Sequence, residues 1–233
     1  MMDRKFRLPR VWSNHELRKL APLFSGHVAN VSGWDDRDKQ GGSYRNYFSS
    51  ATSYSITNYL GERGFQNQSD EIHLDLTGDL PPELVKAFDH VFNHTTLEHI
   101  FEVRKAFSNL CSMARECVIV VVPFAQVEHE IEGSFGDYWR FTPSCLRAMF
   151  RENGFEVIYE AESPDLDAGI YIFMVGSRNP DVWRGRMPSH MPIRTAGVWL
   201  GFCDRRIISR AADFVSRRLR EGRLKGLRKR ARQ

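Results

Sequence analysis

The sequence predicts an α/β protein built on an open, mostly parallel sheet. Strand-like apolar segments, separated by helical or loop crossovers, recur between residues 27 and 177. Residues 117–122 are apolar at successive positions, as expected for a central parallel strand that is buried on both faces. Residues 155–160 and 170–176 are two further strand segments joined only by a loop, so we expect them to pair antiparallel.

The first expected element is a short amphipathic helix over about residues 14–23. Ser13-Asn14-His15-Glu16 fits a capping box, in which serine caps the helix and glutamate follows three residues later. Apolar residues from Leu17 to Phe24 then recur at helical spacing. The strands expected next span 27–32, 54–57, 71–76 and 88–92, with a helical or turn segment over 44–50.

Two helices are expected in the second half of the chain. A helical stripe of apolar residues starts at Leu97 and reaches Ala114. Thr142-Pro143 is a good helix start, because a hydroxyl cap precedes proline at the first helical position. Asn153-Gly154 ends that helix with glycine at the left-handed position.

Composition is that of an ordinary soluble protein. The 233 residues are 42% hydrophobic and 27% charged, and the longest apolar run, near 118–122, is far short of the roughly 20 residues that cross a bilayer. No apolar segment follows the basic start, so we expect no secretory signal. The four cysteines show no metal-finger spacing, which indicates reduced thiols in a cytoplasmic protein.

Positive charge is concentrated at the end of the chain. Residues 204–233 carry a net charge of +9, which leaves −5 for the rest of a chain whose total is +4. Apolar residues from Ile207 to Leu219 recur at helical spacing among arginines, so residues 205–232 are expected to include a basic amphipathic helix that binds an anionic membrane surface. The alternatives are docking of its apolar face on the domain, and nucleic-acid binding, which the few interleaved aromatic residues disfavour.

Polar residues follow the expected strands where such sheets bind ligands. In an open α/β sheet, ligands bind beyond the carboxyl ends of the strands, where the strand order reverses. The positions that this rule singles out are Ser32-Gly33-Trp34, Asn58, Asp75-Leu76, Asn93-His94 and the segment from Pro123 onward.

Three segments carry a family resemblance. They are DLTGDLP (Asp75–Pro81), FDHVFNHTTLEHI (Phe88–Ile100) and DYWRFTPSCLRAMFRENGFEV (Asp137–Val157). On these segments, residues 27–177 resemble the class I S-adenosylmethionine-dependent methyltransferases, particularly small methyltransferase-like proteins linked to bacterial cell-surface glycan synthesis. The resemblance implies a Rossmann-like seven-stranded sheet whose last strand is antiparallel, preceded by an N-terminal helix and followed by the basic C-terminal helix.

The same resemblance implies a cofactor, S-adenosyl-L-methionine, across the tips of the first four strands. Residues that match the family's cofactor positions are Ser32, Gly33 and Trp34 beside the methionine portion, Asn58 at the ribose, Asp75 and Leu76 at the adenine, and Asn93 and His94 in the loop after strand four.

Two positions depart from the family pattern. The family's first loop is usually rich in glycine, which lets the backbone approach the cofactor, whereas here Gly33 is followed by the bulky Trp34. The second strand usually ends in an acidic residue that accepts hydrogen bonds from the ribose, and Asn58 accepts without the strength of a carboxylate. These departures support an alternative, a non-catalytic methyltransferase-like scaffold or partner protein.

Two clusters have the residue types of a metal site without its spacing. Residues 35–39 are dense in carboxylates but lack the spacing of a calcium loop, so we expect a solvated loop. His94, Glu98 and His99 lack the H-E-x-x-H spacing of a zinc pair. We therefore expect no metal here.

The segment after strand 88–92 has two further interpretations. One is that the strand tip lines the cofactor pocket, with no acid–base role for Glu98. The other is a plain helix start in which Thr95 or Thr96 caps and Glu98 favours the positive helix end. We favour the first.

The loop after the fifth strand carries the acceptor candidates. Methyl transfer to a hydroxyl requires loss of its proton, and His129 has the side chain whose unperturbed pKa suits that task, although a solvated surface histidine is an equal alternative. Tyr138 and Trp139 could stack on a sugar ring, and Arg140, next in the Asp137-Tyr138-Trp139-Arg140 run, could bind a phosphate or carboxylate. For Trp139, the alternative is packing of this loop on helix 143–153.

The function that these features predict is S-adenosylmethionine-dependent O-methylation of a glycan or lipid-linked sugar, in the cytoplasm or at the inner face of the membrane. An RNA methyltransferase is a third possibility, which rests only on the charge of the tail. The expected organisation is a helical lead over residues 1–26, a methyltransferase-like domain over 27–180, and a linker with the basic tail over 181–233.

Overall fold

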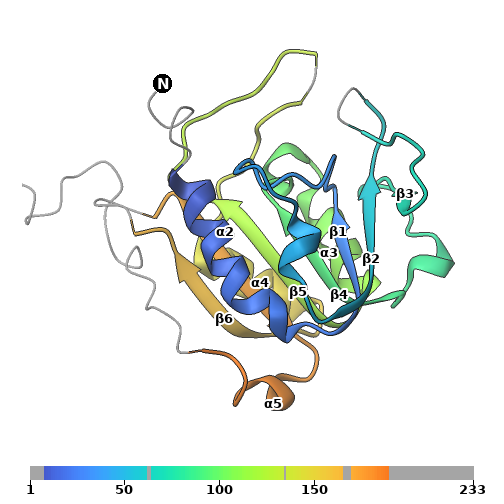
Figure 1. Ribbon diagram of the computed structural model, residues 1–233. Coiled ribbons are helices and arrows are strands. Elements are labelled where there is room, and N and C mark those ends of the chain that lie inside the picture. Colours follow the sequence, from blue (N-terminus) through green and yellow to red (C-terminus); the bar gives the residue numbers. More distant parts are fainter. Residues whose placement is uncertain (1–7, 62–63, 134, 165–168, 189–233) are drawn as a thin grey trace, which may run out of the picture.

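The computed structural model describes residues 8–61, 64–133, 135–164 and 169–188. In these residues a seven-stranded sheet has the order β3-β2-β1-β4-β5-β7-β6 (Figure 1). The neighbours up to β5 pair parallel, and β7 is antiparallel to both β5 and β6, so the predicted Rossmann-like sheet with an antiparallel last strand is confirmed. The strands are β1 Gly26–Val31, β2 Ala51–Asn58, β3 Glu71–His73, β4 Phe88–His94, β5 Ala114–Pro123, β6 Glu156–Glu162 and β7 Tyr171–Ser177.

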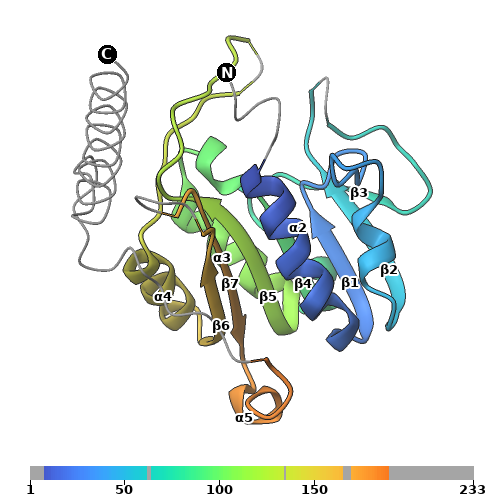
Figure 2. The same ribbon diagram turned by 60° about the vertical axis from the view of Figure 1, so that its left-hand side comes forward.

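Helices cover both faces of the sheet (Figure 2). One face packs against α3 (Val103–Met113) and α4 (Pro143–Glu152). The other packs against α2 (Leu8–Leu20), the 3₁₀ turns η1 (Ala21–Leu23) and η2 (Tyr44–Tyr47), and α5 (Pro180–Trp183). Alternate residues of β5 enter the two cores, as its unbroken apolar run predicted: Val118, Val120 and Val122 on one side, Cys117, Ile119 and Val121 on the other.

The N-terminal helix begins earlier than predicted. The capping box at Ser13 is wrong, because α2 starts at Leu8 with Pro9 in its first turn, a position that suits proline. Ser13 lies inside the helix, fully buried, and its Oγ contacts the carbonyl oxygen of Arg10 and Nε2 of His94. The tertiary contact with β4 therefore overrides the local capping pattern.

The crossovers from β1 to β3 contain no α-helix in the residues that the structure describes. Only η2 interrupts the loop between β1 and β2. The sheet face left open there is covered by α2 and η1, which bury Leu17, Leu20 and Phe24 completely. The N-terminal segment is thus part of the core.

The segment after β4 does not form the single helix that was predicted from Leu97 to Ala114. It forms the 3₁₀ turn η4 (Leu97–His99) and then α3, and no side chain caps η4 at Thr96. A further 3₁₀ turn, η3 (Pro82–Leu84), lies between β3 and β4. By contrast, α4 begins as predicted, with Thr142 Oγ1 accepting a hydrogen bond from the Cys145 backbone N–H over 3.1 Å, and Gly154 follows it at φ +75°.

The expectation of a solvated loop at residues 35–39 is wrong for two of its carboxylates. Asp36 and Asp38 are 5% and 1% exposed. Each accepts several hydrogen bonds from the surrounding loop and from η2, so these charges organise the loop after β1 from within.

Other predictions fall partly outside the described residues. The basic tail, residues 205–232, lies outside them, so the division into 1–26, 27–180 and 181–233 stays a prediction. Cys111 and Cys117 are buried free thiols, and Cys145 is an exposed one. Within the described ranges, every helix is too short or too polar to cross a bilayer.

Candidate functional site

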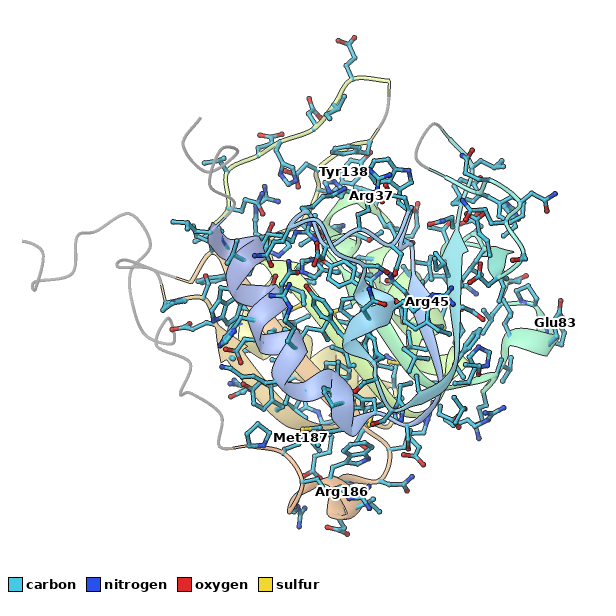
Figure 3. The ribbon with its side chains drawn as sticks, in the orientation of Figure 1. Arg37, Arg45, Glu83, Tyr138, Arg186 and Met187 are labelled. Atoms are coloured by element: carbon cyan, nitrogen blue, oxygen red, sulfur yellow. The ribbon has the colours of Figure 1, made fainter. Side chains whose placement is uncertain are left out.

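A cavity of about 920 Å³ opens at the carboxyl ends of β1, β2 and β4. Arg37 and Tyr138, both labelled in Figure 3, lie on its rim. Its volume is near the upper end of the range of small-molecule binding pockets, about 300–1,000 Å³. It brings together most of the predicted site residues: Ser32, Gly33, Trp34, Asn58, Asp75, Leu76, His94, His129 and Tyr138. Four predicted residues lie outside its lining: Asn93, Asp137, Trp139 and Arg140.

The turn after β1 is shaped without a glycine-rich motif. Ser32 and Trp34 adopt left-handed backbone conformations, with φ of 56° and 49°. A Cβ on Gly33 would lie 2.5 Å from Nδ2 of Asn30, so this one glycine is required by close approach. Asn30 in turn donates from Nδ2 to Oδ1 of Asp36 over 2.7 Å. Hydrogen bonds thus hold this turn in left-handed conformations that glycine residues would adopt more easily.

Asn58 at the end of β2 binds the backbone of that turn. Its Oδ1 accepts from the Trp34 backbone N–H over 2.7 Å, and its Nδ2 donates to the Trp34 carbonyl over 3.0 Å. Nδ2 also donates to Oε1 of Glu71 on β3 over 2.6 Å. Both polar atoms of Asn58 are therefore paired within the protein, and Oδ1 has one remaining acceptor position.

Asp75 and Leu76 form the cavity wall after β3. Leu76 is buried, whereas Asp75 is partly open to the cavity. Burial opposes ionisation of Asp75, but hydrogen bonds from Thr77 and Gly78 outweigh it and lower the pKa of the carboxyl. The wall thus presents a carboxylate beside an apolar surface.

His94 at the tip of β4 joins the sheet to α2. Its Nδ1 lies 2.7 Å from Nη1 of Arg10 and its Nε2 lies 2.8 Å from Oγ of Ser13. Because a guanidinium only donates, Nδ1 is the acceptor and the ring is neutral. Burial and the adjacent Arg10 charge lower the pKa of His94 well below its usual value. The preceding Asn93 points into the protein, where its Nδ2 donates to the Val31 carbonyl over 2.9 Å.

Arg10 is a site residue that sequence reasoning missed. Its guanidinium also donates to Tyr44 OH over 3.1 Å and to Thr95 Oγ1 over 2.7 Å. All of these partners are neutral, so the half-buried cation lines the cavity without a hydrogen-bonded carboxylate among the described residues. The only sequence signal was a basic residue beside Pro9 before the predicted helix.

Glu98 and His99 are also more involved than predicted. Glu98 is completely buried, and neither of its carboxyl oxygens has a hydrogen-bond partner among the described residues. Burial raises the pKa of Glu98 to about 8. His99 Nδ1 lies 2.6 Å from the Gly136 carbonyl, and its Nε2 lies 3.8 Å from Oε1 of Glu98. Glu98 does lie in the first turn of η4, as the alternative interpretation had it, but that 3₁₀ turn is only three residues long.

His129 reaches the cavity from the loop after β5. Its Nδ1 lies 2.9 Å from Oδ2 of Asp137, without the alignment of a hydrogen bond. Its backbone N–H donates to the same carboxylate over 2.7 Å. Although burial opposes it, hydrogen bonding from Arg140 and from the His129 backbone lowers the pKa of Asp137 to about 2. An ionised carboxylate therefore lies 2.9 Å from the imidazole.

Arg140 fixes this loop. All five N–H donors of its guanidinium have acceptors: both oxygens of Asp137 and the carbonyls of Gln126, Val127 and Trp139. The guanidinium is thus already saturated, and Asp137 and Arg140 act together to position His129.

Of the two aromatic residues predicted to stack on a sugar, only Tyr138 lies at the cavity. Trp139 turns away from the cavity, and its indole N–H contacts the carbonyls of Ile100 and Phe101 at 3.0 and 3.2 Å. Tyr138 stays at the rim, 53% exposed, with its ring edge-on to Phe101, which is 64% exposed. Tyr138 and Phe101 therefore form the exposed aromatic surface beside the cavity.

Comparisons with known proteins place the fold. No protein-family model and no curated protein matches the sequence. Among solved structures, a chain from the Haloferax volcanii complex between the Trm112 methyltransferase activator and a methyltransferase has a TM-score of 0.56 and 15% identity, covering 76% of this chain and 92% of its own.

Two further structures agree. Magnesium protoporphyrin IX methyltransferase (ChlM) from Synechocystis PCC 6803, solved with bound SAH, has a TM-score of 0.50 and 13% identity, covering 76% of this chain and 87% of its own. An S-adenosylmethionine-dependent methyltransferase from Listeria monocytogenes has a TM-score of 0.52 and 14% identity, covering 73% and 98%. At such low identity these likenesses concern architecture alone: this chain has the class I S-adenosylmethionine-dependent methyltransferase fold.

Proposed function

We propose that this protein transfers the methyl group of S-adenosyl-L-methionine to a hydroxyl of a glycan or lipid-linked sugar. The observation that carries the proposal is that the strand-tip residues and His129 line one and the same cavity. Its volume of about 920 Å³ accommodates a cofactor together with part of an acceptor. The sugar class of the acceptor rests on the sequence resemblance.

The cofactor would lie across β1, β2 and β4, with its two ends recognised by opposite charges. Arg10 supports the methionine end, because a half-buried guanidinium with only neutral hydrogen-bond partners gains a charge-assisted bond from an α-carboxylate. Asp75 and Leu76 would contact the adenine. Ser32–Trp34 would lie beside the methionine portion, and the remaining acceptor position of Asn58 would face the ribose. His94 would line the cavity after β4, and Asn93 would support the strand tip from inside.

The reaction would be an in-line displacement. The acceptor oxygen attacks the methyl carbon, the carbon–sulfur bond breaks with its electron pair going to sulfur, and the sulfonium becomes a neutral thioether. The hydroxyl proton passes to His129, which lies 2.9 Å from the Asp137 carboxylate. Most of the rate gain would come from positioning the two substrates. Arg140 would contribute by fixing Asp137 rather than by touching the acceptor.

The acceptor would enter beside Tyr138. Tyr138 and Phe101 are exposed at the cavity, and aromatic faces of this kind stack on the apolar faces of sugar rings. Trp139 would support this surface through its bonds to the backbone of residues 100–101. The basic residues 205–232 would bring the protein to an anionic membrane, where lipid-linked acceptors are found.

A second candidate is a methyltransferase-like partner protein without catalysis. The observation that favours it is Asn58, whose amide is committed to Trp34 and Glu71 where a ribose-binding carboxylate is expected. The Haloferax volcanii structure was solved as a complex with an activator protein, which makes a protein partner a reasonable expectation for this chain as well.

Calorimetric titration with S-adenosyl-L-methionine separates the two candidates. Binding at micromolar to submillimolar cofactor, weakened by Asp75→Ala and unchanged by His15→Ala on the exposed face of α2, is the expected result. No binding at millimolar cofactor would overturn the enzymatic proposal. In a transfer assay with labelled methyl groups, His129→Gln should retain cofactor binding and lose transfer.

The acceptor and the membrane are tested separately. Label should appear in sugar or lipid-linked sugar fractions, whereas transfer to RNA alone would favour the RNA methyltransferase. For the tail, the full chain should sediment with anionic vesicles and a chain ending at Arg194 should not. Equal sedimentation of both would remove the membrane proposal.

A further inference from the structure

A cluster of three potential metal ligands lies on the acceptor side of the cavity. Glu98 and His99 in η4 and His129 in the loop after β5 bring one ligand atom each to within 4.8 Å of one another. The two histidines line the cavity, and Glu98 lies behind them, completely buried. Two segments that are 30 residues apart in sequence therefore converge on one point.

The surroundings of the two rings are those of metal-bound histidines. Such histidines usually direct their second nitrogen to a backbone carbonyl or a carboxylate, which fixes the ring and increases its basicity. His99 Nδ1 lies 2.6 Å from the Gly136 carbonyl, which requires that Nδ1 carry the proton and that Nε2 offer its lone pair toward Glu98. His129 Nδ1 lies 2.9 Å from the Asp137 carboxylate, without the alignment of a hydrogen bond. The hydrogen-bonded contact is thus present for His99, and a carboxylate lies close to the second ring.

Glu98 supplies the independent sign of a missing partner. Both of its carboxyl oxygens are buried, and neither is hydrogen-bonded within the described residues. Burial of a polar group without a partner is costly, and native structures avoid it unless an ion, a water or a ligand completes the site. A cation at the cluster would contact this carboxylate directly.

The donor set selects the class of ion. Two imidazole nitrogens and one carboxylate oxygen suit zinc or another first-row transition metal rather than the all-oxygen environments of calcium and magnesium. Three protein ligands leave at least one coordination position open, as in catalytic zinc sites. Since zinc–nitrogen bonds are about 2.0–2.1 Å long, the ligand atoms would draw closer together on binding.

We propose that Glu98, His99 and His129 bind one divalent transition-metal cation with an open coordination position facing the cavity, where an oxygen of the acceptor binds. The cation site itself goes beyond the proposed methyl transfer and does not depend on it, whereas its role toward the acceptor rests on that proposed function. A nitrogen of His129 that ligates the ion cannot take a proton, so in the loaded protein the ion would acidify the hydroxyl that it binds, and that hydroxyl would lose its proton to solvent water.

The test uses full-length, untagged protein stripped with a chelator. Calorimetric titration with zinc chloride should reach saturation at one ion per chain, and cobalt(II) should give the visible absorption of a protein-bound ion. His99→Ala and Glu98→Gln should each weaken zinc binding at least tenfold, whereas His15→Ala should leave it unchanged. Glutamine has nearly the same size and shape as glutamate and can also form hydrogen bonds. The circular dichroism spectrum of Glu98→Gln should therefore match that of the native protein.

The open position is tested on the cobalt-loaded protein. Acetohydroxamate, a small oxygen chelator, should change the visible spectrum by binding to the ion. Absence of zinc binding, or zinc binding that survives in both variants, would overturn the site, and an unchanged spectrum would overturn its open position. Titration of the same preparations with S-adenosyl-L-methionine distinguishes the two proposals. Absence of zinc binding alone would overturn the cation site, and absence of cofactor binding alone would overturn the proposed methyl transfer.

Discussion

Arg10 donates a hydrogen bond to His94, with Nη1 and Nδ1 2.7 Å apart, and so connects α2 to the tip of β4 across 84 residues of sequence. The contact places a half-buried cation at the edge of the cavity and holds the imidazole neutral. Since its other partners, Tyr44 and Thr95, are neutral too, the guanidinium is available to an anionic ligand.

Arg10→Gln should therefore weaken S-adenosyl-L-methionine binding about 10- to 100-fold, the range expected for loss of a hydrogen bond to a charged group. Calorimetric titration measures the change. Arg18→Gln is the matched control, since Arg18 lies on the same helix but pairs with Asp38 away from the cavity. Equal affinities for native protein and Arg10→Gln would mean that the cofactor carboxylate binds elsewhere.

Asn58→Asp, which restores the acidic residue usual for the fold, should destabilise this protein by about 1–3 kcal/mol at pH 7. The reason is that Nδ2 donates to Glu71 and to the Trp34 carbonyl, and a carboxylate would lose both bonds and repel Glu71. Urea unfolding gives the free energy. Adding Glu71→Gln should recover much of the loss, and a double mutant with simply additive effects would contradict the coupling.

Asp36→Asn should lower the free energy of unfolding by about 2 kcal/mol or more, because donors would be left facing an amide. The carboxylate accepts bonds from Asn30, Ser43, Tyr54 and the Arg45 backbone. Asp35→Asn, one residue earlier and paired only with the exposed Arg37, should change stability by less than about 0.5 kcal/mol. Similar effects of the two substitutions would show that burial of Asp36 is unimportant.

His90 should make stability depend on pH. It is 2% exposed between the rings of Phe24 and Trp183, and burial lowers its pKa from 6.5 to about 4. The unfolded chain binds a proton below pH 6.5 while the folded protein resists one until about pH 4, so this stabilising contribution is lost as the pH falls through that window. The loss should be about 2 kcal/mol between pH 7 and pH 5.

His90→Gln should remove that part of the pH dependence, because glutamine stays uncharged and still offers an N–H donor. Chemical denaturation of both proteins at pH 5 and pH 7 provides the comparison. Parallel pH profiles would show that His90 does not titrate in this range.

Elements whose cause is local were predictable. The unbroken apolar run of β5, the Thr142-Pro143 start of α4 and the glycine after its last turn each act within a few residues, and each was found where expected. The antiparallel pairing of β6 and β7 followed from the short loop between them.

Elements whose cause is distant were not predictable. Ser13 reads as a helix cap, but its partner is His94, 81 residues away, so the helix begins earlier. Asp36 reads as solvated, but its partners include Tyr54 on β2, 18 residues away. A pattern within one segment carries no information on which other segment will cover it.

The sequence by itself determined the succession of strands and helices along the chain. It also determined that the cavity lies at the carboxyl ends of the strands, and most of the residues that line it. These features follow from periodicity, turn chemistry and the geometry of parallel sheets. Only the tertiary structure decided which charges are buried and what they face. It placed Arg10 at the cavity and Arg140 against Asp137. It also left the carboxyl oxygens of Glu98 without a hydrogen bond among the described residues, beside two histidines. Those outcomes depend on which side chains approach across the folded sheet, since the energy of a charge is set by its surroundings in space.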